Sequence, residues 1–130
     1  GVFDFISSFE ENTPFPAKSK ILNIICGGSP KNRPKCYKKI TPENWISEDS
    51  PPFLILQGET DTLISIEETK KFWKTLISKN RNSSAFLNLP LLQHGFDIFP
   101  TLTEQCIFPI IEQFFTMLHC NYKTRDNETI

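Results

Sequence analysis

Two short apolar runs and two helical patterns alternate along the second half of this 130-residue chain. Residues 53–56 are continuously apolar, which is typical of a strand buried on both faces of a parallel sheet. Residues 85–89 form a second strand candidate. Between the two runs, residues 67–80 carry apolar side chains at intervals of three and four, which predicts an amphipathic helix. The predicted buried stripe of this helix comprises Thr69, Phe72, Trp73, Leu76 and Ile77.

A second amphipathic helix follows the second strand candidate. Its apolar stripe comprises Ile107, Ile110, Ile111, Phe114, Phe115 and Leu118. Pro109 lies inside this pattern, so the helix either begins near Pro109 or kinks there. The order strand, helix, strand, helix implies right-handed crossovers and a parallel sheet with helices packed on its faces, which is an α/β fold. Two strands cannot make such a sheet alone, so we expect an incomplete sheet in this chain.

The first half of the chain is less regular. Residues 1–5 have the pattern of a strand end, and residues 17–26 are a short helical candidate that Gly27 and Gly28 would stop. Residues 29–50 are rich in proline and charge, which predicts a long surface excursion. Within it we expect one helical turn that Thr41 caps and Pro42 begins. At the other end of the chain, residues 121–130 predict a polar, frayed tail.

Charge balance and cysteine spacing exclude several classes of function. Fourteen Lys and Arg stand against fifteen Asp and Glu, so the charge gives no reason to expect a nucleic acid or an anionic membrane as partner. No apolar run approaches the roughly 20 residues of a membrane-spanning helix. The four cysteines are Cys26, Cys36, Cys106 and Cys120. Their spacing fits no metal site, so we expect free thiols and no metal, while redox compartment and location stay open.

Two loops that leave the carboxyl ends of the strand candidates carry the residues with catalytic potential. In an open α/β sheet, loops at this edge point side chains into a crevice. Residues 57–65 contain Glu59 and Asp61, and residues 91–97 contain His94, one of two histidines. A carboxylate beside a histidine can accept a hydrogen bond from imidazole Nδ1–H and stabilise the imidazolium that forms when Nε2 takes a proton from a nucleophile. We therefore expect an acid–base pair at this edge.

At these loops the sequence resembles the esterase and lipase branch of the α/β-hydrolase family. The segment PPFLILQGETD, which ends at Asp61, is similar to the family segment P-P-x-L-x-x-H-G-x-x-D-x-x-V-P. The segment QHGF at residues 93–96 is similar to the family's G-H-G-F. This fold places Ser first, Asp second and His third. The resemblance thus implies that Asp61 is the triad acid, that His94 is the general base, and that residues 1–120 are the C-terminal portion of an α/β-hydrolase domain.

Three departures from the family pattern stand out. Gln57 replaces a His before Gly58, and Ile64-Ser65 replaces Val-Pro after the acid; these are support positions. No G-x-S-x-G occurs in the chain, and the Gly-Gly-Ser at residues 27–29 lacks the second glycine of that motif. The resemblance therefore implies that the nucleophilic serine and the oxyanion hole lie upstream of Gly1. We expect the chain to be inactive without that upstream part of the domain.

The function that the resemblance implies is hydrolysis of small-molecule carboxylic esters through an acyl-serine intermediate, without a metal or an organic cofactor. A peptidase or amidase of the same superfamily would use the same acid and base. A non-catalytic α/β-hydrolase-like binding module would have lost the serine. An unrelated doubly wound binding domain is a further alternative, which no Gly-rich phosphate loop supports.

The remaining candidate residues have simpler structural interpretations. Glu59 is the competing acid, and we expect it to face solvent. His119, near the end of the last helix, suits the helix dipole or packing. Asp4 and Asp97 are interpreted as structural. We interpret the aromatic residues of both helices as packed faces rather than as an acyl pocket.

Overall fold

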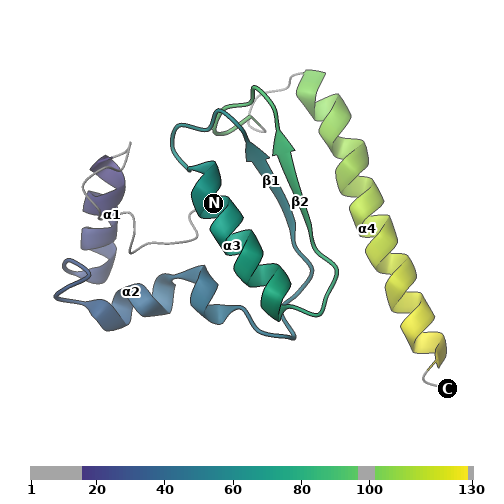
Figure 1. Cartoon of the computed structure of the whole chain (residues 1–130), viewed down its shortest axis with the longest axis horizontal. Coiled ribbons are helices and arrows are strands. Elements are labelled where there is room, and N and C mark those ends of the chain that lie inside the picture. The colour runs from purple at the N-terminus through teal and green to yellow at the C-terminus, as the bar shows by residue number, and fades with distance from the viewer. Residues whose placement is uncertain (1–15, 97–101, 129–130) are drawn as a thin grey trace.

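Two parallel strands lie between two long helices at the centre of the structure (Figure 1). The protein, as a computed structural model, is described for residues 16–96 and 102–128. Its elements are α1 (Pro16–Cys26), α2 (Pro34–Ile40), the 3-10 helix η2 (Pro42–Trp45), β1 (Leu54–Gly58), α3 (Ile66–Lys79), β2 (Ala85–Leu89) and α4 (Leu102–Glu128). The strand end predicted for residues 1–5 lies outside the described residues.

β1 and β2 pair in parallel, with Leu54 opposite Ala85 and Gly58 opposite Leu89. The predicted strands, their parallel direction and the α/β class are therefore confirmed. Because the strands run in the same direction, their carboxyl ends lie at one edge, and the β1–α3 and β2–α4 loops both leave from it (Figure 1). Within the described ranges, β2 is the one strand paired with β1. The side of β1 that faces away from β2 has no paired strand in this part of the chain.

The start of α3 is determined by an N-cap. Ser65 Oγ accepts a hydrogen bond of 3.1 Å from the backbone N–H of Glu68. Glu67 and Glu68 place negative charge in the first turn, where the helix dipole favours it. The helix occupies residues 66–79, one residue earlier at each end than the sequence pattern predicts.

One side of α3 packs against β1. Phe72 and Leu76 bury their side chains together with Ile55, and each such burial contributes roughly 1.5–3 kcal/mol to stability. These contacts confirm the centre of the predicted stripe. Ile77 is 54% exposed, so the stripe was predicted too wide. The reason is geometric, because Ile77 lies about 100° around the helix from Leu76.

α4 lies on the other side of the strands (Figure 1). Ile107 and Phe114 are buried, but Phe115 is 63% exposed, which contradicts its predicted place in the packed face. Phe115 directly follows Phe114 and so points away from the side that Phe114 covers. α4 begins at Leu102, well before Pro109, so the helix does not begin at that proline.

α4 continues to Glu128, so residues 121–128 are helical where the sequence predicts a frayed tail. The predicted division into a domain of residues 1–120 and a tail stays a prediction. No helix in residues 16–96 and 102–128 has the length and apolarity needed to cross a lipid bilayer.

The end of α1 follows the glycine signal. Gly27 has a φ of 67°, in the left-handed region, and its N–H approaches Ile24 O at 3.4 Å. Gly28 N–H donates to Asn23 O at 2.9 Å. These two bonds form a Schellman motif, which satisfies carbonyls at the end of the helix. The predicted stop at the two glycines is confirmed.

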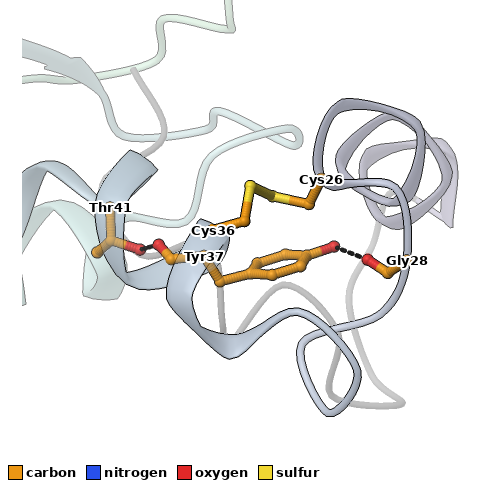
Figure 2. The surroundings of a disulfide bond; sticks show 5 residues. All are labelled: Cys26, Gly28, Cys36, Tyr37 and Thr41. Atoms are coloured by element: carbon orange, nitrogen blue, oxygen red, sulfur yellow. Dashed lines mark hydrogen bonds between the residues drawn. A yellow bond between two sulfur atoms is a disulfide. The ribbon is translucent and has the colours of Figure 1, made fainter.

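Residues 29–50 are more helical than the sequence predicts, because α2 lies within them. Tyr37 of α2 is fully buried, and its hydroxyl donates to Gly28 O at 3.1 Å (Figure 2). The predicted turn exists as η2, with Pro42 at its start, but the Thr41 side chain makes no cap hydrogen bond. Thr41 Oγ1 instead donates to Tyr37 O at 2.8 Å. Burial of Tyr37 between two helices stabilises α2, and this tertiary contact leaves no local signal.

The expectation of four free thiols is wrong for two of them, because Cys26 and Cys36 form a disulfide (Figure 2). Their Cα atoms lie 5.7 Å apart, within the range that a disulfide spans, because the chain turns back after α1. The bond closes a loop with a sequence separation of 10, which corresponds to about 3 kcal/mol in the loop-entropy account. Cys106 and Cys120 are free and exposed.

We predict that trypsin digestion of the full-length, unreduced protein leaves the peptides of residues 21–31 and 36–38 joined. These peptides contain Cys26 and Cys36, and reduction should release both. Mass spectrometry with and without reductant measures this. Cys106 and Cys120 are the internal control, because both should react with iodoacetamide before reduction. Alkylation of Cys26 and Cys36 in the unreduced, natively purified protein would contradict the disulfide.

We also predict that the 130-residue chain associates when it is produced alone. The unpaired edge of β1 offers backbone groups to other strands, and exposed apolar side chains such as Ile24 and Phe115 favour association. Light scattering after size exclusion measures the mass of the species. A monomer that melts cooperatively would show that this expectation is wrong.

Candidate active site

Asp61 and His94 lie together at the carboxyl edge of the two strands. Asp61 belongs to the β1–α3 loop and His94 to the β2–α4 loop. The distance between Asp61 Oδ2 and His94 Nδ1 is 2.9 Å, which is a hydrogen bond. The pair that the sequence predicts at adjacent strand ends is thus in contact.

The Asp61 carboxylate is held by its own loop. Oδ1 accepts the backbone N–H groups of Leu63 at 2.9 Å and Ile64 at 2.8 Å. The residues that depart from the Val-Pro of the family pattern both have structural tasks here. Ile64 buries its side chain and donates its N–H to Asp61, and Ser65 caps α3. The departure therefore preserves the support of the carboxylate.

The pKa of Asp61 lies below its ordinary value. Burial raises this pKa, and the side chain is only 7% exposed. Hydrogen bonds from Ile64 N–H, His94 and Leu63 N–H, together with attraction to a charged His94, outweigh the burial. The pocket around Asp61 therefore favours the carboxylate over the neutral acid.

A carboxylate beside Nδ1 determines the tautomer of His94. Because an ionised carboxylate only accepts hydrogen bonds, the proton of the neutral ring is on Nδ1. The lone pair is then on Nε2, which has no hydrogen-bond partner among the described residues. The side chain is 43% exposed. His94 is therefore arranged to accept a proton at Nε2 from a group on its open side.

Gly58 lets the two loops approach each other. A Cβ atom at this position would lie 2.4 Å from Leu92 O and 2.9 Å from Leu92 C, which are backbone atoms that cannot easily move. Thr60 joins the loops, since its N–H donates to Leu92 O at 3.1 Å and its hydroxyl to the same oxygen at 2.9 Å. Leu91 adopts a φ of 61°, a left-handed turn that directs the chain towards His94.

The sequence did not predict the contacts of Gln57. The one signal was that Gln57 replaces the His of the family pattern. Its side chain is buried in the strand that leads to Asp61. Nε2 lies 3.2 Å from Asp61 Oδ2, and Oε1 accepts the hydroxyl of Thr69 at 2.8 Å. Asp61 is thus linked to α3 through Gln57.

The other sequence candidates do not join this pair. Glu59 is exposed, and its backbone N–H donates to Leu89 O at 2.9 Å. His119 lies on α4 as an exposed residue. Asp4 and Asp97 lie outside the described residues. In the described part of the chain, no group of three or more His, Cys, Asp or Glu side chains could hold a metal ion.

A cleft of about 520 Å³ adjoins the pair. Its polar wall contains Asp61 and His94, while Leu56 of β1 and Ile107 and Ile111 of α4 contribute apolar surface. This volume is in the range of small-molecule sites, which are roughly 300–1,000 Å³. The arrangement combines a proton acceptor with an apolar surface open to solvent.

The sequence is similar to a known family and to several named proteins. A family model described as BD-FAE matches residues 1–76. The chain is 25% identical over 120 residues to a Mycobacterium tuberculosis protein named probable carboxylic ester hydrolase LipM, a match that covers 92% of this chain and 27% of LipM. It is 31% identical over 65 residues to esterase LipC of the same organism, over 50% of this chain and 16% of LipC.

A third relative has a different printed activity. The chain is 30% identical over 69 residues to the uncharacterized peptidase YtmA of Bacillus subtilis, over 53% of this chain and 26% of YtmA. Across these three relatives the match spans between 16% and 27% of the relative's length. No solved structure matches the chain at a significant level.

We predict that Gly58→Ala destabilises the full-length protein by about 1–3 kcal/mol, the usual cost of forcing an atom into packed surroundings. The new Cβ would collide with Leu92 O and push the His94 loop away from Asp61. Urea unfolding measures the change. Thr62→Ala, in the same loop at an exposed position, is the control and should remain within about 0.5 kcal/mol of the parent. Equal stability of Gly58→Ala and the parent would contradict the close approach.

Proposed function

The chain belongs to the BD-FAE family, and from this premise we propose that it supplies the acid, Asp61, and the base, His94, of a serine-dependent carboxylic ester hydrolase. The observation that carries the proposal is the 2.9 Å hydrogen bond between Asp61 Oδ2 and His94 Nδ1. Relatives named as a probable carboxylic ester hydrolase and as an esterase support the substrate class.

In the proposed reaction, His94 Nε2 removes the proton from a serine hydroxyl while the serine oxygen attacks the ester carbonyl carbon. The tetrahedral intermediate then collapses, and His94 returns the proton to the leaving alcohol. Water repeats the two steps on the acyl-serine, with the serine as leaving group. Asp61 keeps the His94 proton on Nδ1 and stabilises the imidazolium formed in each step.

The serine belongs to the part of the protein before Gly1 in this proposal. No G-x-S-x-G occurs in the sequence, and the fold order of the resembling family places the nucleophile before the acid. The same upstream part would pair with the free edge of β1 and complete the oxyanion hole. On its own, the 130-residue chain would then position Asp61 and His94 but would not hydrolyse the substrate.

A peptidase or amidase activity is the second candidate, and the similarity to YtmA favours it. The acid and base would act in the same way, with an amine in place of the alcohol as leaving group. A matched pair of p-nitrophenyl acetate and acetyl p-nitroanilide separates the two candidates in the full-length protein. The ester proposal expects turnover of the ester and little turnover of the anilide.

We predict that His94→Ala and Asp61→Asn each lower ester kcat/KM of the full-length protein by roughly 10³–10⁴-fold. His94→Ala removes the proton acceptor. Asp61→Asn keeps the shape but no longer fixes the proton on Nδ1. Steady-state hydrolysis of p-nitrophenyl acetate measures both losses.

His119→Ala is the matched control, because His119 is the second histidine and lies outside the site. It should retain the parental rate. Near-parental kcat/KM in His94→Ala or Asp61→Asn would overturn the assignment of the pair. A full-length protein with no serine nucleophile would favour the non-catalytic binding module.

A further inference from the structure

The buried side-chain amide of Gln57 has four polar contacts, three at Nε2 and one at Oε1. The residue is only 4% exposed and lies at the end of β1. Its Nε2 lies 3.2 Å from each of three oxygens: Gly58 O, Ile64 O and Asp61 Oδ2. On the other side, Oε1 accepts the hydroxyl of Thr69, a fully buried residue of α3. The side chain thus joins β1, the β1–α3 loop and α3.

The surroundings determine which way the amide points. Two carbonyls and a carboxylate can only accept hydrogen bonds, so the NH₂ group has to face them. A flipped amide would set Oε1 against three acceptors, while its NH₂ group would face the Thr69 hydroxyl, which can donate or accept. In the observed orientation, the Thr69 hydroxyl donates a hydrogen bond to Oε1 at 2.8 Å. The orientation of Gln57 is therefore built into the packing.

We propose that Gln57 is a positioning residue that holds Asp61 Oδ2 against His94, with the Thr69 hydroxyl holding the other end of the Gln57 amide. This inference rests on the proposed function, since it concerns the same acid–base pair. In this proposal, Gln57 contacts neither the substrate nor the reacting atoms. It acts through Asp61.

The two oxygens of Asp61 show why a side-chain donor matters. Oδ1 is held by two backbone N–H groups of the loop. Oδ2 bears the contact with His94, and among the described residues Gln57 Nε2 is the other donor near that oxygen. Without Gln57, Asp61 Oδ2 loses a donor that opposes its displacement from His94, and only the two bonds at Oδ1 then limit rotation of the carboxylate. The imidazolium would lose stabilisation although the backbone is unchanged.

Substitution with methionine provides the direct test in the full-length protein. Gln57→Met keeps an unbranched side chain of similar volume and removes both polar ends. We expect kcat for p-nitrophenyl acetate to fall roughly 10–100-fold, the loss expected for one hydrogen bond to a charged group. We expect KM to stay within about twofold, because Gln57 acts in the transition state through the His94 cation. Gln113→Met, at an exposed position of α4, is the matched control and should keep the parental kcat.

Two further variants separate positioning from general packing. Gln57→His places the resembling family's residue at this position, offers one donor and one acceptor, and should recover most of the lost kcat. Thr69→Val should lower kcat in the same direction but less, and combining it with Gln57→Met should add no further loss. Thr116→Val, an exposed helix position whose hydroxyl bonds Glu112 O, is the control for Thr69. Thr69→Val also tests the proposal if Gln57→Met does not fold.

A spectroscopic readout distinguishes failure of this inference from failure of the proposed function. The ¹⁵N shifts of the His94 imidazole report which nitrogen bears the proton in the neutral ring. The parent should show the Nδ1–H form, and Gln57→Met should show a mixture of both forms, with His119 as internal reference. This holds whether or not the protein hydrolyses esters.

Two results would overturn the inference. One is parental kcat and an unchanged Nδ1–H form in Gln57→Met and Thr69→Val. The other is a loss of kcat that matches a loss of melting temperature and that Gln57→His does not recover, because this pattern means that Gln57 only fills space. Absence of ester turnover in the parent would contradict the proposed function alone.

Discussion

The parallel pairing of β1 with β2 is the constraint on which the site depends. It sends the β1–α3 loop and the β2–α4 loop out from the same edge (Figure 1). The close approach of the two loops also depends on Gly58 and Thr60. Gly58 removes the side chain that would separate them, and Thr60 ties the second loop to the first through Leu92 O. The acid–base contact is thus a consequence of backbone geometry.

A buried carboxylate is stable only if its surroundings replace the water it has lost. Asp61 meets this requirement with four donors, two from the loop backbone and one each from Gln57 and His94. The helix α3 extends this support, because the Thr69 hydroxyl holds the Gln57 amide, and Ser65 starts the helix next to the loop. The β1–α3 loop and α3 therefore form one hydrogen-bonded unit.

Local patterns predicted much of the fold and failed where contacts between distant residues decide. The strand runs, the α3 stripe at Phe72 and Leu76, and the helix stop at Gly27 were visible because each depends on neighbouring residues. α2 was missed because burial of Tyr37 and the Cys26–Cys36 disulfide stabilise it, and both depend on how the chain turns back after α1. The exposed Phe115 was misplaced because periodicity alone does not say where the buried face of a helix ends.

The candidate site shows the same division. Motif spacing pointed to Asp61 and His94, whose catalytic role stays a prediction, and to the resemblance with esterases. The similarity to LipM and LipC confirms that resemblance. The contacts of Gln57 were not predictable, because they involve three acceptors that come together only in the folded β1–α3 loop.

The most direct measurement is the rate at which a fluorophosphonate labels the full-length protein. Such a reagent bonds to a serine oxygen and releases fluoride only when a base takes the serine proton. The account predicts one labelled serine upstream of Gly1 in the parent, and labelling slower by orders of magnitude when His94 is replaced by alanine. Equal labelling rates in the two proteins, or no labelled serine in the parent, would contradict the claim that this chain supplies the base of a serine hydrolase.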